Sequence, residues 1–325
     1  MKNFINISDH SSNDLRAIID EAKARKLKRQ NLNKSAPDED KPFEGKSMAM
    51  IFEKPSTRTR MSFDIAVKQL GGTSIILNPD GIHYGKGDET LKDTAKVLTE
   101  YVDIVMLRTS SHKNLEEFGK HLDIPIINGL SDIGHPCQIM SDILTYEESN
   151  GTIEGKKVAW VGDGNNVLHD LMLACAMLGI DFHYAYPKGY EPAEDVVARA
   201  EDFANDNGSQ MVGGNDPAEA VKDANVIYTD VFVSMGEEGL KDKMADFDGF
   251  QVNMELVSNA DDNWAFMHCL PAHRGDEVTD AVMDHENSIV FDQAENRMWA
   301  QMSLLAYLVD HGAWSAMGEM MGVGF

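Results

Sequence analysis

The chain contains little cysteine. Its 325 residues include three, Cys137, Cys175 and Cys269, whose spacing matches neither a disulfide framework nor a zinc site. A site built from His135, Cys137 and Cys269 is conceivable, but no spacing supports it, so we expect no metal. Cysteine usage of this kind is typical of a reducing compartment, and we expect the protein to be cytoplasmic.

Long apolar runs and repeats are absent as well. No uninterrupted apolar stretch reaches membrane length, and MKNFINISDHSSNDLRAIIDEA at the start has the pattern of a capped amphipathic helix. We therefore expect neither an export signal nor a membrane partner. The lack of a repeating unit also excludes solenoid architectures.

Positive charge is scarce too. Lys and Arg number 29 against 54 Asp and Glu, and the formal net charge is −25. Nucleic-acid binding requires clustered cations, so this composition argues against it. On such an acidic background, arginines that stand near motifs are informative, and they are Arg58, Arg60, Arg108, Arg274 and Arg297.

Short apolar runs alternate with helical patterns along most of the chain. The runs are SMAMIF, TSIILN, DIVMLR, IPIIN, KVAWVG, DFHYAY, NVIYTD, WAFMHC and SIVFD. This alternation predicts an α/β fold with doubly wound parallel sheets flanked by helices, and the length suggests about two domains. We place one domain at 1–150 and the other at 151–294, with a long helix at 135–151 as the bridge. A final helix, about 295–325, is expected to pack back on the first domain.

The run STRTR at 56–60 has the properties of a phosphate cradle. Apolar residues then recur at helical spacing from Phe63 to Leu70, until Gly71 and Gly72 end the pattern. STRTR therefore occupies a helix start, where unpaired N–H groups, hydroxyls and guanidinium groups all favour an oxyanion. The alternative is a helix cap with two solvated arginines.

Further polar residues fall at predicted strand ends or helix starts, where an α/β site is assembled. Arg108 ends a strand, and His135 and Gln138 share one helix face. The others follow the later strands and are Asn165, Asn166, Asp230, His268, Cys269, Leu270 and Pro271. Singly, each is as readily a solvated or core residue.

Two familiar chemistries fit these residues poorly. The turn GDGNN lacks the third glycine of a dinucleotide-binding fingerprint, so a nucleotide-dependent oxidoreductase is a remote alternative. His268 and Cys269 are neighbours on a strand, and their side chains therefore point to opposite faces. A thiol nucleophile with its own histidine base is rejected on this ground.

Taken together and in order, FEKPSTRTRMSF, MLRT, HPCQ, WVGDGNN, DVFVSMG and HCLPAHRG resemble the carbamoyltransferases. HCLP and SMG resemble the ornithine branch of that family, and the likeness covers residues 1–312. It implies a carbamoyl phosphate-binding domain and an ornithine-binding domain, joined by two interdomain helices. It also implies a homotrimer, with a higher assembly of trimers left open, and no cofactor.

The resemblance implies a role for each matching residue. Carbamoyl phosphate would be bound by Ser56, Thr57, Arg58, Thr59, His83, Arg108, His135, Gln138, Cys269, Leu270 and Arg297. Within this set the catalytic residues would be Arg108, His135, Cys269 and Arg297. His83 would reach a neighbouring subunit, with Lys86 as the alternative. Ornithine would be bound by Asn166, Asp230, Ser234 and Met235.

The acceptor can also be argued from charge. An aspartate acceptor would need cations in the second domain, whereas Asp230 suits an α-ammonium group, so a diamino acid is expected. The predicted reaction joins the carbamoyl group of carbamoyl phosphate to the δ-amine of L-ornithine, giving L-citrulline and phosphate, in arginine synthesis or breakdown. A relative with another amine acceptor and a catalytically idle member stay as alternatives.

Overall fold

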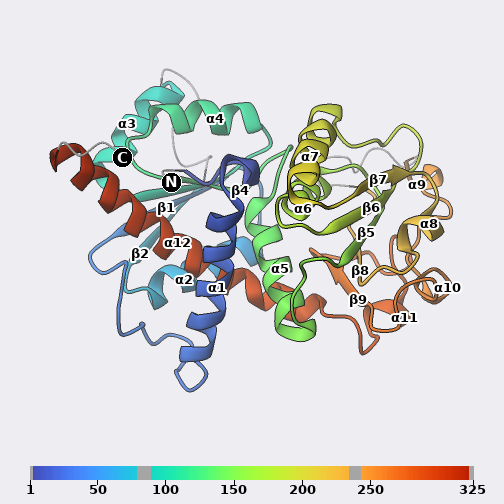
Figure 1. The fold of residues 1–325 in the computed structure, drawn as a ribbon. Helices are drawn as coiled ribbons and strands as arrows, with labels where there is room; N and C mark the ends of the chain where they lie inside the picture. The colour runs from blue at the N-terminus through green and yellow to red at the C-terminus, as the bar shows by residue number, and fades with distance from the viewer. Residues whose placement is uncertain (1–2, 79–88, 234–242, 322–325) are drawn as a thin grey trace. The chain divides into compact units, whose positions relative to one another are not determined.

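The computed structural model describes residues 3–78, 89–233 and 243–321, and side chains up to residue 309. The chain divides into two compact units (Figure 1). The first comprises Met1–Ser141 with Arg297–Phe325, and the second is Asp142–Asn296. None of the helices within the described ranges is both long and apolar enough to cross a membrane.

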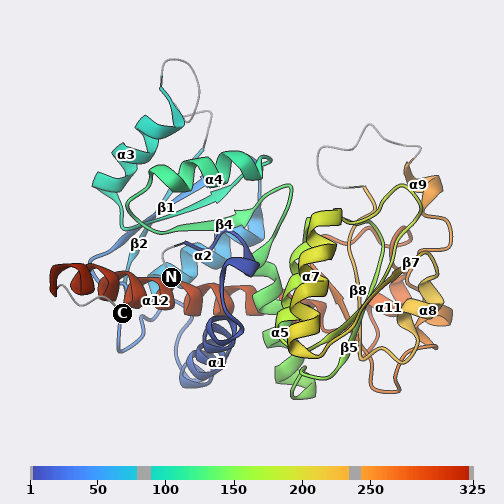
Figure 2. The same ribbon diagram turned by 45° about the horizontal axis from the view of Figure 1, so that its top comes forward.

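The first unit is built on a four-stranded parallel sheet. Its strands, in the spatial order β2-β1-β3-β4, are β1 (Ser47–Phe52), β2 (Thr73–Leu77), β3 (Ile104–Arg108) and β4 (Ile126–Leu130). The helices before and between them are η1 (Ile7–Asp9), α1 (Ser12–Lys28), α2 (Thr57–Gln69), α3 (Leu91–Tyr101) and α4 (His112–His121). Figure 2 shows α3 and α4 on one face of the sheet and α1 and α2 on the other. Every residue of the central strand β3 is buried, as expected of a parallel strand covered on both faces.

Strand ends in this unit are aligned by register. Phe52 pairs with Arg108 across β1 and β3, and Arg108 pairs with Leu130 across β3 and β4. In a parallel sheet, aligned carboxyl ends bring the following loops to one edge. This edge carries the start of α2 and the end of β3.

The second unit has a five-stranded parallel sheet of order β7-β6-β5-β8-β9. Its strands are β5 (Lys157–Val161), β6 (Asp181–Ala185), β7 (Met211–Gly214), β8 (Val226–Thr229) and β9 (Ala265–His268). Its helices are α6 (Asn166–Met177), α7 (Glu194–Asn207), α8 (Pro217–Val221), α9 (Lys243–Asp246), α10 (Met254–Val257) and α11 (Asp280–Met283). In Figure 1, α6 and α7 lie together on one face of this sheet. Apolar residues of α8, α10 and α11 form a shared core with the sheet.

Two helices belong to both units. α5 (Pro136–Asn150) and α12 (Val290–Met321) are each divided between them, after Ser141 and before Arg297. The doubly wound α/β class and the helix expected at 135–151 are thus confirmed.

Two local expectations were wrong or incomplete. SIVFD is not a strand: Ser288 makes one isolated bridge with Phe266, and α12 begins at Val290. A short apolar run has no period that separates a strand from a helix start. The strand β7, in contrast, was missed because its sequence, MVGG, contains two glycines that weaken strand propensity.

Candidate active site

The start of α2 combines a helix cap with buried polar side chains. Ser56 caps the helix, and its Oγ accepts a hydrogen bond from the Thr59 amide at 3.3 Å. Gly71, with φ +90°, follows the last turn, as the sequence predicted. Thr59 is fully buried and Arg58 is half-buried, whereas Thr57 is exposed. The helix N-terminus therefore presents N–H groups and hydroxyls together.

Arg108 is held at the end of β3 by the neighbouring strand. The Glu53 amide donates to the Arg108 carbonyl at 2.9 Å, and Thr109 Oγ1 donates to Glu53 Oε2 at 2.5 Å. Arg108 itself is 4% exposed. Because its backbone is bonded to Glu53, the residue that follows β1, its side chain starts from a fixed position at the sheet edge.

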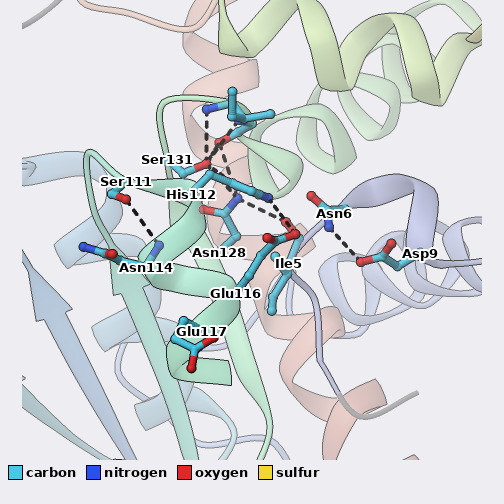
Figure 3. Close-up of polar contacts among 12 residues, drawn as sticks. Ile5, Asn6, Asp9, Ser111, His112, Asn114, Glu116, Glu117, Asn128 and Ser131 are labelled. Atoms are coloured by element: carbon cyan, nitrogen blue, oxygen red, sulfur yellow. Dashed lines mark hydrogen bonds and ion pairs between the residues drawn. The ribbon is translucent and has the colours of Figure 1, made fainter. Parts of the chain in front are cut away.

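The turn before His135 is organised by Ser131, which is fully buried. Figure 3 shows His112, on the first turn of α4, directed at this serine; its Nδ1 lies 2.8 Å from Ser131 Oγ. The same oxygen accepts from the amides of Ile133 at 3.4 Å and Gly134 at 3.2 Å. A separate bond from Asn128 Nδ2 to the Ile5 carbonyl, at 3.1 Å, holds the end of β4 (Figure 3). No pattern in the sequence predicted this role of His112 or Ser131.

His135 is a buried imidazole among cations. Burial, followed by the positive charges of Arg297, Arg108 and Arg58, lowers its pKa well below the ordinary value of 6.5. The ring is therefore neutral at neutral pH. Its Nδ1 is buried and makes no hydrogen bond within the part of the chain that the structure describes. Gln138, also buried, lies on the first turn of α5, which begins directly after His135, and its backbone amide donates to the His135 carbonyl at 2.9 Å.

Arg297 completes the cluster from the other end of the chain. Although it lies on α12, its Nη2 donates to Thr59 Oγ1 at 2.8 Å, and it is 4% exposed. The first unit thus brings together the guanidinium groups of Arg58, Arg108 and Arg297, the neutral imidazole of His135 and the start of α2. This arrangement can bind a multiply charged oxyanion and stabilise negative charge that develops beside it.

In the second unit, Asp230 is the centre of a polar cluster beyond β8. Its Oδ2 accepts from Asn165 Nδ2 at 2.8 Å, and its Oδ1 accepts from the Val231 amide at 2.8 Å and from Cys269 Sγ at 3.0 Å. Asn165 also caps α6 through the amides of Val167 and Leu168. Asn165 and Asn166 were both candidates from the sequence; Asn166, which the resemblance assigned to ornithine, is half-buried at the first position of α6.

His268 and Cys269 have separate partners, as expected for neighbours on a strand. His268 Nε2 lies 3.1 Å from Glu277 Oε1, whereas the Cys269 thiol donates to Asp230. The Leu270 amide donates to His268 Nδ1 at 2.9 Å. Both ring nitrogens are engaged, which argues against metal binding by Asp230, His268 and Cys269, whose ligand atoms all lie within 4.8 Å of one another. A second such group, His273, Asp276 and Glu277, is mostly exposed.

A buried lysine next to the GDGNN turn was not apparent from the sequence. Lys243 is 5% exposed, and its Nζ lies 2.7 Å from Asp163 Oδ2. The same atom is 5.2 Å from the ring centroid of Tyr190 and 5.8 Å from that of Phe247. A lysine within the polar run LKDK has no periodic pattern that would predict its burial.

Four sequence-predicted residues lie outside the described residues: His83, Lys86, Ser234 and Met235.

Comparison with known proteins matches both units to one family. The model "Aspartate/ornithine carbamoyltransferase, carbamoyl-P binding domain" matches residues 2–148, and the corresponding "Asp/Orn binding domain" matches residues 154–308. The chain is 48% identical to an ornithine carbamoyltransferase of Bacillus subtilis over 312 residues, covering 96% of this chain and 95% of the relative. It is 47% identical to one of Anoxybacillus flavithermus over 309 residues, covering 95% and 96%. The structure of ornithine carbamoyltransferase from Pyrococcus furiosus superimposes with a TM-score of 0.91 at 46% identity, covering 95% of this chain and 97% of that one.

Proposed function

We propose an ornithine carbamoyltransferase activity for this chain, which belongs to the aspartate/ornithine carbamoyltransferase family. The reaction transfers the carbamoyl group of carbamoyl phosphate to the δ-amine of L-ornithine and gives L-citrulline and phosphate. Relatives named ornithine carbamoyltransferase share 47% and 48% sequence identity with this chain over nearly its whole length, and this similarity supports the activity.

We assign carbamoyl phosphate to the first domain, 1–150 with the helix from about 295. The phosphate would be held by Ser56, Thr57, Arg58 and Thr59 at the start of α2. The observation that carries this assignment is the buried, neutral His135 beside three guanidinium groups. Positive charge concentrated in a buried site, in a protein of net charge −25, favours the binding of an anionic ligand there.

Catalysis would combine charge stabilisation with substrate positioning. Attack of the amine on the carbonyl carbon forms a tetrahedral oxyanion, which Thr59, Arg108, His135 and Arg297 would stabilise. The carbamoyl NH₂ would be held by Gln138, together with Cys269 and the Leu270 backbone. The C–O bond to phosphate then breaks, and the departing phosphate takes the proton of the amine. No covalent enzyme intermediate and no cofactor is needed.

The acceptor site is assigned to the second domain, 151–294. Asp230 is an anion that suits the α-ammonium of an amino acid, and Asn166, Ser234 and Met235 would contact the rest of it. Since the δ-amine has an intrinsic pKa near that of lysine, about 10.4, it must lose a proton before it attacks. We therefore expect turnover at fixed ornithine concentration to rise with pH.

Assembly as a homotrimer is part of the proposal. Apolar side chains are exposed on the edge strand β2 and on α2, with Ile75 44%, Ile76 36% and Met61 53% exposed. An exposed apolar edge strand requires cover, and a second copy of the chain would provide it. We place His83, or Lys86, at the phosphate of that neighbouring subunit, and the enzyme in the cytoplasm.

The deciding experiment is a citrulline assay in which ornithine, lysine, putrescine and aspartate are offered in parallel with carbamoyl phosphate. Ornithine is expected to be used far better than the others. Putrescine would leave the partners of the α-amino and α-carboxylate groups unpaired, at about 1–3 kcal/mol each. Comparable rates with ornithine and putrescine would contradict the acceptor assignment. Thermal stabilisation by carbamoyl phosphate without any turnover would identify an idle member.

A further inference from the structure

His268 and Glu277 form a pair that is sealed from solvent. Both side chains are 0% exposed, and His268 Nε2 lies 3.1 Å from Glu277 Oε1. The same carboxylate oxygen accepts from the His273 amide at 2.5 Å. A buried carboxylate is costly unless hydrogen bonds satisfy it, and here two N–H donors converge on one oxygen.

The other ring nitrogen fixes the tautomer of His268. The Leu270 amide donates to Nδ1 at 2.9 Å, so Nδ1 must carry a lone pair. The ring proton then resides on Nε2 and is donated to Glu277. A proton on Nδ1 would face the Leu270 N–H and abolish that hydrogen bond.

The residue held by this bond is in an unfavourable backbone conformation. Leu270 has φ +57°, in the left-handed region that a non-glycine residue seldom adopts. Immediately before it, Cys269 directs its thiol at Asp230 Oδ1, at 3.0 Å. The His268 amide is fixed independently, because it donates to Gln293 Oε1 at 3.0 Å.

We propose that His268 and Glu277 are positioning residues of the active site: Glu277 selects the tautomer of His268, and His268 holds the Cys269–Leu270 turn in its working conformation. The proposal rests on the function proposed above, because Cys269 and Leu270 are part of the assigned site. Neither His268 nor Glu277 touches substrate in this scheme; both act through the turn.

Two substitutions of His268 separate its two hydrogen bonds. The amide oxygen of Asn occupies nearly the place of Nδ1, so His268→Asn keeps an acceptor for the Leu270 amide and loses the donor to Glu277. The amide nitrogen of Gln occupies nearly the place of Nε2, so His268→Gln keeps that donor and loses the acceptor. We expect His268→Gln to lower kcat about tenfold more than His268→Asn, the equivalent of one hydrogen bond.

A second measurement does not depend on turnover. The rate at which iodoacetamide alkylates Cys269 is followed by peptide mass spectrometry, with buried Cys137 and Cys175 as internal controls. Without the hydrogen bond from the Leu270 amide to residue 268, the Cys269–Leu270 turn can move and the contact between the Cys269 thiol and Asp230 is lost. Cys269 should therefore react faster in His268→Gln than in His268→Asn. Thermal unfolding of both variants reports the loss of stability that they share.

A different result is expected if His268 and Glu277 contribute only to the stability of the fold. Both variants would then unfold at a lower temperature, while kcat of the folded fraction and the alkylation rate of Cys269 would be the same in the two; this outcome overturns the proposal. If His268→Gln does not fold, Glu277→Met replaces it, because methionine has a similar length but no oxygen to accept the proton of His268 Nε2. Unchanged kcat and alkylation in Glu277→Met would likewise overturn it. An unmodified protein that makes no citrulline would refute the proposed function and leave the alkylation comparison valid.

Discussion

Thr59 and Arg297 are joined by a hydrogen bond although 238 positions separate them in the chain, with Arg297 Nη2 donating to Thr59 Oγ1 at 2.8 Å. Both residues are buried. The bond fixes a flexible guanidinium beside the start of α2, so the cation is in place before an anion binds. Pre-organised donors of this kind lose less conformational entropy on binding.

Thr59→Val tests this pre-organisation, because valine keeps the shape of the side chain but removes the acceptor for Arg297. We expect the KM for carbamoyl phosphate to rise about tenfold, the equivalent of one hydrogen bond, with little change in the KM for ornithine. Thr59→Ser is the matched control, since it keeps the hydroxyl. Equal KM values for the Val and Ser variants would contradict the role given to this bond.

Arg108→Ala removes a proposed oxyanion donor. Loss of one such donor costs about 2.7–4 kcal/mol of transition-state stabilisation, so kcat for citrulline formation should fall at least about a hundredfold. Arg16→Ala is the control, because Arg16 lies on α1, where its contact with Asp20 is a partly exposed pair at 3.7 Å. A turnover of Arg108→Ala within a few-fold of the unmodified protein would remove Arg108 from the mechanism.

His135 should make stability depend on pH. Its pKa in the folded protein lies well below the ordinary 6.5, through burial and then the charges of Arg297, Arg108 and Arg58. Between these two pKa values the unfolded chain binds more protons than the folded one, so the free energy of unfolding falls as pH falls below about 6.5. Urea unfolding at pH 5.0 and 7.5, in a buffer without phosphate, measures this difference. His135→Gln should show a smaller difference, and an identical one would contradict the assignment.

Asp230→Asn tests the acceptor site. The neutral amide keeps the size of the side chain and one oxygen, which can accept from either Asn165 Nδ2 or the Val231 amide, but it no longer attracts an α-ammonium group. We expect the KM for ornithine to rise sharply while the KM for carbamoyl phosphate changes little. An unchanged ornithine KM in steady-state citrulline assays would require the α-ammonium to bind elsewhere.

The sequence predicted the sheets and most of their strands because buried parallel strands form short apolar runs such as SMAMIF and KVAWV. It also placed Ser56 at a helix start, since capping is local. The resemblance assigned Arg297 and Thr59 to one site, but no pattern of residues predicted their direct contact, because that contact depends on the path of α12. Nor could the sequence assign Glu277 to His268, since a single glutamate in an exposed-looking polar run, RGDEVTD, has no pattern that predicts full burial.

The turn before His135 offers a last test, because substitution of Ser131 in this turn can be compared with substitution of Ser111 at the start of α4. Ser131→Ala removes the oxygen that accepts from Ile133 and Gly134 and contacts His112, and the buried Gly134 amide loses this acceptor at a cost of about 1–3 kcal/mol. Since this turn leads directly into His135, we also expect a higher KM for carbamoyl phosphate. Ser111→Ala is the control: the Ser111 hydroxyl caps α4 by accepting from the Asn114 amide at 3.2 Å, and a lost cap costs about 1 kcal/mol. Both variants should melt at a lower temperature, but only Ser131→Ala should bind carbamoyl phosphate more weakly. Equal KM values in the two would mean that the turn supports the fold without positioning His135.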